Sequence, residues 1–193
     1  IAYLVKMSSD KKVQFVSFET ILDSEQFIKR WQQYTRSLDS DLDVTLQQSE
    51  KNGVYKYVAQ HRFAVDELVF IFSKERRISG FAQTKIKTMQ AGGYSILQAE
   101  RLHDAYTNES KIFIFLIHPG IDLNKYRELA SHSQLNIYQA YYENCRYDYI
   151  LEYFVKTKYV AELMEQLKQY DIAEIGLYKE CTLKPANPLL YIK

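Results

Sequence analysis

The chain has 193 residues, 47% hydrophobic and 25% charged, which is the composition of an ordinary globular protein. The formal net charge is only +1, so no strong electrostatic field favours nucleic acid as a partner. No apolar run approaches the roughly 20 residues that a membrane-spanning helix needs. The two cysteines, Cys145 and Cys181, do not make a disulfide framework, and we therefore expect a cytoplasmic protein.

The first half of the chain alternates strand and helix patterns. Residues 13–21 are apolar on both faces, as in a central strand. Residues 23–25 favour a helix start, and apolar residues then recur at helical spacing as far as Leu38. Further strands are predicted at 44–48, 54–63 and 94–102, and a further helix at 66–78.

Gly53, Gly92 and Gly93 mark an expected turn and an expected break in this half. Asn52-Gly53 predicts a tight hairpin turn with a positive φ at Gly53. Gly92 and Gly93 are expected to break the chain before the last strand. The segment 79–90, which precedes that break, fits either a helical turn or a loop.

The same order of elements repeats in the second half, with a period of about 98 residues. Strands are predicted at 111–118, 135–143, 147–155 and 172–183, and helices at 122–131 and 158–170. The repeat matches Phe27 with Tyr126 and 94–97 with 173–176. We therefore predict a unit at 1–102, a linker at 103–110, a second unit at 111–184 and a C-terminal tail at 185–193.

The predicted fold class is α+β, with two tandem ferredoxin-like βαββαβ units. Right-handed crossovers place both helices of such a unit on one face of its antiparallel sheet. The bare apolar faces, at about 1.5–3 kcal/mol per side chain, are too costly to expose. We therefore expect the sheets to pack face to face as an α+β barrel. In that arrangement Cys145 and Cys181 lie on opposite sheet edges, so no disulfide is expected.

The first half resembles a known family, the antibiotic-biosynthesis-monooxygenase-like (ABM) proteins of the dimeric α+β barrel superfamily. The resemblance covers about 13–102 and is carried by Phe18, Phe27, Trp31, the strand 55–62 and the helix 66–70. It implies two ferredoxin-like units packed sheet to sheet. The family includes cofactor-independent quinone-forming monooxygenases, haem-degrading enzymes and members without an assigned activity.

The pattern of the haem-degrading branch is absent. That branch carries an Asn in the first strand, a Trp at the end of the third strand and a His further along. Here the first strand has no Asn, Phe63 stands at the Trp position and Ser73 stands near the His position. The resemblance therefore does not imply haem cleavage.

His61 and Arg62, in the third predicted strand, are the candidate catalytic residues. An imidazole with an ordinary pKa of about 6.5 suits a general base beside a sheet-lined cavity, and a partly exposed strand histidine is the alternative. Phe63 and His118 are candidate ligand-binding residues, because strand ends commonly line the mouth of a cavity. For His118 the alternative is a turn residue before Pro119.

Tyrosines crowd the last predicted hairpin of the second half. The candidate ligand-binding set there is Tyr138, Tyr142, Tyr149 and Tyr153. Strand alternation points some of them inward, where they would line a cavity for a planar aromatic or quinone-like molecule. Packing of these rings in the core is the alternative.

Three hypotheses for function follow. The first is an ABM-like enzyme, possibly a cofactor-independent monooxygenase, acting on an aromatic or quinone-like molecule without a bound metal or other cofactor. The second is a non-catalytic ligand-binding protein, and the third is a structural or interaction protein with a filled barrel. Whether the chain is an enzyme stays open. The expected partner is a small molecule, with no nucleic acid or membrane, and the chain is expected to be a monomer or a homodimer.

Overall fold

The computed structural model describes residues 11–36, 43–51, 54–64, 86–101, 108–141 and 145–181. The strands in these ranges are β1 (Lys11–Thr20), β2 (Asp43–Lys51), β3 (Tyr57–Ala64), β4 (Ile86–Ala99), β5 (Glu109–Leu116), β6 (Ser133–Ala140), β7 (Tyr149–Lys156) and β8 (Glu174–Glu180). The helices are α2 (Ser24–Arg36), α5 (Asn124–Glu128) and α6 (Val160–Leu167), and the short 3₁₀ turn η2 (Thr157–Tyr159) leads into α6.

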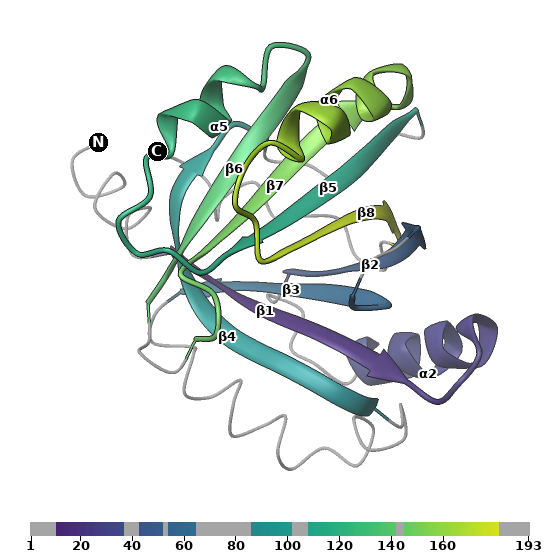
Figure 1. Ribbon diagram of the computed structural model, residues 1–193. Coiled ribbons are helices and arrows are strands. Elements are labelled where there is room, and N and C mark those ends of the chain that lie inside the picture. The colour runs from purple at the N-terminus through teal and green to yellow at the C-terminus, as the bar shows by residue number, and fades with distance from the viewer. Residues whose placement is uncertain are drawn as a thin grey trace, which may run out of the picture.

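The described strands close into one antiparallel barrel, in the order β1-β3-β2-β8-β5-β7-β6-β4. The mixed α+β fold and the barrel were predicted from the sequence. The sequence did not predict the hydrogen-bonded strand pairs that join the two halves, β2 with β8 and β4 with β6. The strands of the two halves therefore form one continuous curled sheet. The helices lie on its outside, α5 and α6 together over the second half and α2 beside the first (Figure 1).

The two halves pair their strands in the same register. Phe15 on β1 lies opposite Gln60 on β3. Phe113 on β5 lies opposite Glu152 on β7. Phe15 and Phe113 are 98 residues apart, which is the period seen in the sequence. Strand pairing alone therefore places Gln60 and Glu152 at corresponding positions.

The last strand of each half follows the same register. Gly92 on β4 lies opposite Phe15, and Gly176 on β8 lies opposite Phe113. These glycines are thus the corresponding positions of β4 and β8. The predicted match of 94–97 with 173–176 is therefore wrong, because it shifts one strand against the other.

Aromatic rings fill much of the described barrel interior. The inner apolar cluster consists of Val13, Phe15, Tyr55, Val58, Tyr94, Phe113, Phe115, Tyr138, Tyr147, Ile150 and Tyr178. The Phe15 ring centroid lies 4.8 Å from that of Tyr138 and 5.5 Å from that of Tyr94. A Cβ on Gly176 would come within 2.5 Å of the Tyr178 ring, so the missing side chain makes room for that ring.

Apolar side chains also cover the outside of the barrel wall beneath the helices. In the second half Leu163 and Leu167 of α6 pack with Tyr126 of α5 and Tyr153 of β7. In the first half the buried aromatic set beneath α2 is Phe18, Phe27, Trp31 and Tyr57. Asp23 caps α2, because its carboxylate accepts a hydrogen bond from the Gln26 backbone N–H at 2.9 Å.

The bounds of several strands differ from those predicted from the sequence. The predicted break at Gly92 and Gly93 is wrong, because β4 runs unbroken through both glycines while paired with β1. That strand begins at Ile86, inside the segment 79–90, and ends at Ala99. β5 begins at Glu109, inside the predicted linker, because Glu109 and Ser110 pair with the end of β7.

The predicted helix at 122–131 is shorter in the structure, where α5 spans Asn124–Glu128. The Ser133 N–H already bonds to the Ala130 carbonyl in the turn that leads into β6. Cys145 and Cys181 are both free thiols, which confirms that prediction. The helix expected at 66–78, the turn at Gly53 and the tail at 185–193 lie outside the described residues.

Candidate functional site

The predicted catalytic pair lies on β3, in the middle of the first half. The backbone of His61 pairs with Gln14 of β1 and with Val44 of β2. The side chains of His61, Arg62 and Phe63 lie outside the described part of the structure, as does the whole of Tyr142. Their proposed roles stay predictions.

His118 follows the end of β5 and is exposed. Its carbonyl accepts a hydrogen bond from the Ile121 N–H at 3.3 Å, which is the geometry of a turn. This placement matches the turn alternative drawn from the sequence, and a ligand-binding role for His118 stays a prediction.

The barrel wall separates the other predicted tyrosines. Tyr138 points into the barrel and belongs to the inner cluster. Tyr149 and Tyr153 point outward, beneath the helices. Their hydroxyls donate to backbone carbonyls, Tyr149 to Pro119 at 3.3 Å and Tyr153 to Tyr126 at 2.8 Å. The structure therefore does not gather these three rings around one interior site.

A buried charged network lies at the centre of the barrel. The Glu152 carboxylate accepts hydrogen bonds from Tyr138 Oη at 2.8 Å, Asn136 Nδ2 at 3.0 Å and Gln60 Nε2 at 3.0 Å. Lys111 Nζ lies 3.1 Å from its Oε2 atom, and both charged side chains are 0% exposed. These donors offset the cost of removing a carboxylate from water.

Lys111 on β5 joins two more strands to this network. Its Nζ lies 3.6 Å from Glu180 Oε1 on β8. It lies 3.1 Å from the side-chain amide group of Gln47 on β2. It also lies 4.9 Å from the Phe154 ring centroid on β7. The sequence signal for this network is a single charge at an inward position of an otherwise apolar strand, as at Lys111 in β5 and Glu152 in β7. The predictions missed it.

The interior tyrosine hydroxyls act as hydrogen-bond donors. Burial raises the pKa values of Tyr94, Tyr147 and Tyr178 well above the ordinary value. The hydroxyls of Tyr55 and Tyr147 lie 2.5 Å apart. Because the three shifted phenols stay protonated at neutral pH, they are not general bases.

A small hollow lies among residues of the inner apolar cluster. It lies between Phe15, Tyr94 and Ile150, and its volume of about 10 Å³ has room for one water molecule. This volume is far below the roughly 300–1,000 Å³ of typical ligand pockets. The described aromatic rings pack closely around it.

A larger hollow, lined mainly by residues of α6 and β8, lies outside the barrel. We call it the α6–β8 groove. Its volume is about 610 Å³, within the range of ligand pockets. It is lined by Glu50, Glu109, Ser110, Thr157, Val160, Ala161, Met164, Lys168, Ile175, Gly176, Leu177 and Lys179.

The groove has an apolar floor and polar ends. Met164 of α6 and Ile175 and Leu177 of β8 are only partly buried, and they pack against the outer apolar cluster. At one end the Glu109 carboxylate lies 2.9 Å from Arg101 Nη2. At the same end Lys179 Nζ lies 3.5 Å from Glu50 Oε1. The arrangement suits an amphipathic small molecule, with its apolar part on the floor.

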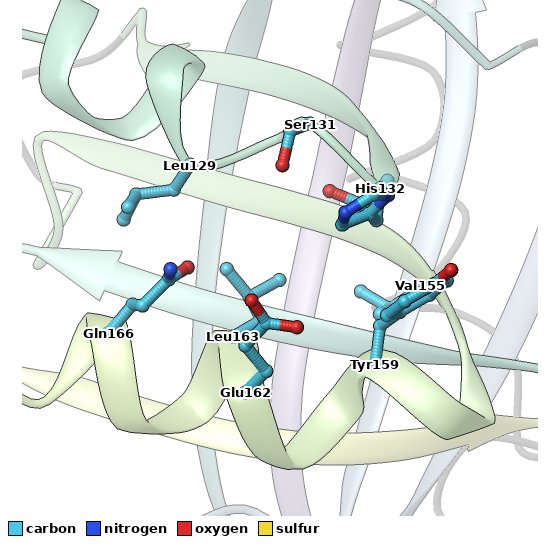
Figure 2. A pocket seen from close by; sticks show the side chains of 9 residues that line it. Leu129, Ser131, His132, Val155, Tyr159, Glu162, Leu163 and Gln166 are labelled. Carbon is cyan, nitrogen blue, oxygen red and sulfur yellow. The ribbon is translucent and has the colours of Figure 1, made fainter.

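A second, much smaller hollow lies on the other side of α6. Figure 2 shows Glu162 and Gln166 of α6 facing the turn that carries Ser131 and His132. The His132 ring stacks on Tyr159, with centroids 4.3 Å apart. The volume of this second hollow is about 10 Å³, which holds one water molecule and is too small for an organic ligand.

Within the described ranges, no three His, Cys, Asp or Glu side chains come together to hold a metal ion. None of the described helices combines the length and apolar character needed to span a membrane.

No protein-family model matches this chain, and no curated protein matches its sequence. Its fold does match solved structures. The chain has an α+β barrel fold. A mutant chlorite dismutase from Candidatus Nitrospira defluvii in complex with cyanide matches with a TM-score of 0.59 and 9% identity, over 98% of this chain and 97% of that chain.

Two other α+β barrel proteins match over most of their length. A candidate monooxygenase from Fusobacterium nucleatum has a TM-score of 0.55 and 12% identity, with 93% of this chain and 95% of that chain covered. An anthrone oxidase-like protein has a TM-score of 0.53 and 8% identity, with 89% and 91% covered. At these identities the likeness establishes the fold alone.

Proposed function

We propose that this chain is a small-molecule-binding protein, and that its ligand lies in the α6–β8 groove. The observation that carries the proposal is the volume of the groove, about 610 Å³, which is within the range of ligand pockets. A largely apolar hollow with a few polar groups at its ends is the common form of a ligand site.

A cofactor-independent monooxygenase acting on an aromatic or quinone-like molecule is the second candidate. The fold is shared with proteins named as a monooxygenase and as anthrone oxidase-like, which favours this activity. In this reaction a methylene group of the substrate would lose a proton, and the resulting carbanion would give electrons to dioxygen. One oxygen atom would become the new carbonyl oxygen and the other would leave as water. His61 would be the base and Arg62 would stabilise the resulting anion.

The proposal extends to the organisation of the chain. The matched registers of Phe15 and Phe113 support two ferredoxin-like units, at 1–102 and 111–184, joined in tandem. The free thiols of Cys145 and Cys181 are compatible with a cytoplasmic location. We propose a monomer or homodimer as the functional form.

Ligand binding in the groove is tested with one variant and one matched control. Met164→Lys places a charge on the floor, whereas Ile117→Lys changes an apolar residue that is 55% exposed and lies outside the groove. Thermal-shift screening of apolar and aromatic compounds, followed by calorimetry, should give ligands that the wild type and Ile117→Lys bind alike. Met164→Lys should weaken their binding at least tenfold.

Equal binding by both variants would place the ligand elsewhere. The second candidate is tested by oxygen uptake with anthrone, compared between the wild type and His61→Ala. Uptake that exceeds the protein-free rate and falls in His61→Ala would support the monooxygenase. A rate equal to the protein-free rate would leave binding as the function.

A further inference from the structure

We infer that the α6–β8 groove binds an unbranched alkyl chain with an uncharged polar head, such as a long-chain alcohol, rather than a planar ring. The inference rests on the proposed function, because it names the ligand class of the same groove. It departs from the aromatic ligand that the tyrosine-rich sequence predicts.

The first support is the chemistry of the floor. Its side chains are all aliphatic or thioether groups: Val160, Ala161, Met164, Ile175 and Leu177. None of the twelve lining residues is aromatic. Planar ligands are commonly held by stacked or edge-on rings, and the clustered buried rings of the described second half lie in the barrel interior and in the core beneath the helices. A flexible thioether beside branched aliphatic groups adapts to a methylene chain.

The second support is the shape of the groove. Its lining residues follow α6, whose eight residues span about 12 Å, and the stretch of β8 from Ile175 to Lys179. At Gly176 the floor is bare backbone, because a side chain there would meet the Tyr178 ring on the inner face. A trough bounded by one helix and one strand fits an extended chain lying lengthwise.

The third support is the charge at the head end. Glu109 is paired with Arg101 at 2.9 Å, and Glu50 is paired with Lys179 at 3.5 Å. Each charge in this part of the lining thus has an opposite partner, so a charged head group would break an existing pair. The Thr157 hydroxyl and the Ser110 side chain stand at the same end and suit a neutral hydroxyl.

The test measures binding of monomeric octanol, decanol and dodecanol by calorimetry to the full chain. Each added methylene should tighten binding about twofold to fourfold until the alkyl chain is longer than the apolar floor. Decanoate and decylammonium should bind at least fivefold more weakly than decanol. The aromatic probes anthrone and 9-anthracenemethanol should also bind at least fivefold more weakly than decanol.

The variant that tests binding in the groove is Ala161→Leu. Ala161 is an exposed helix residue that lines the groove, so leucine fills the hollow without removing a core contact. It should weaken decanol binding at least fivefold, while Ile117→Lys leaves it unchanged. Circular dichroism and the melting temperature check that both variants fold.

The outcomes separate the two proposals. If the aromatic probes bind better than decanol and Ala161→Leu weakens them, the alkyl inference fails while ligand binding in the groove stands. If no probe binds, both proposals fail. A concentration-dependent dimer that Ala161→Leu disrupts would show that a second copy of the chain covers the groove, which also overturns the inference.

Discussion

Gln60 and Glu152 hold corresponding positions in the two halves of the barrel and hydrogen-bond to each other, Gln60 Nε2 donating to Glu152 Oε2 at 3.0 Å. Each is also bonded by its neighbour across the hairpin: the Thr45 hydroxyl donates to Gln60, and the Asn136 amide donates to Glu152. The two halves therefore meet through a matched pair of polar residues, of which only Glu152 carries a charge.

The buried ion pair predicts a large loss of stability when one partner is removed. Lys111→Met should lower the free energy of unfolding by about 3–5 kcal/mol, because it leaves the Glu152 carboxylate charged and buried. Adding Glu152→Gln to that variant should restore part of the loss. Urea unfolding of both single variants and the double variant measures the coupling.

Lys168 provides the matched control for that experiment. It pairs with Glu165 at 2.6 Å, but the two side chains are 64% and 71% exposed. Lys168→Met should therefore change stability very little, because solvent screens an exposed pair. Equal losses of unfolding free energy in Lys111→Met and Lys168→Met would contradict the prediction that the buried ion pair stabilises the fold.

Two tyrosine hydroxyls allow a comparison of charged and neutral acceptors. Tyr138 donates to the Glu152 carboxylate at 2.8 Å, and Tyr153 donates to a backbone carbonyl at 2.8 Å. Tyr138→Phe should cost about 1.5–3 kcal/mol and Tyr153→Phe about 0.5–1.5 kcal/mol. Chemical denaturation of both variants measures the two losses of unfolding free energy. A larger loss in Tyr153→Phe than in Tyr138→Phe would argue against a charged acceptor at Glu152.

The close approach of Tyr178 predicts that Gly176 does not tolerate a side chain. Gly176→Ala should lower stability by about 1–3 kcal/mol, because the new Cβ would lie 2.5 Å from a ring atom of Tyr178. Gly120→Ala is the control, since the nearest atom to its Cβ is 3.9 Å away. A loss in Gly120→Ala as large as in Gly176→Ala would show that the Tyr178 ring is not the cause.

Buried tyrosines predict a loss of stability at alkaline pH. Burial raises the pKa of Tyr178 in the folded chain, whereas in the unfolded chain it stays near about 10. Below about pH 10 both states are protonated and the folded state keeps its full stability. As the pH rises further the unfolded state loses a proton that the folded state retains, so the free energy of unfolding falls.

Urea unfolding between pH 8 and pH 11 measures that slope, and absorbance at 295 nm reports phenolate. Tyr178→Phe should make the slope shallower by one proton. A phenolate signal that appears before unfolding, and that Tyr178→Phe removes, would contradict the raised pKa.

Most elements and their order follow from local patterns in the sequence. Runs of apolar residues predicted at least part of each described strand, and helical spacing from Phe27 to Trp31 predicted α2. The first half of β4 was not predicted. These patterns are local, because a strand or helix must turn its apolar face away from water wherever it lies. The repeat also predicted a barrel, since two bare apolar sheet faces in one chain must cover each other.

Which side chains meet depends on the tertiary structure. Lys111 and Glu152 are 41 positions apart, and no local pattern sets the register of their strands or shows that both side chains point into the barrel. The same holds for Tyr138 and Tyr153, which share a hairpin but face opposite sides of its wall. The α6–β8 groove is likewise a product of packing, because its lining comes from α6, β8 and the ends of β2 and β5, which meet only in the folded protein.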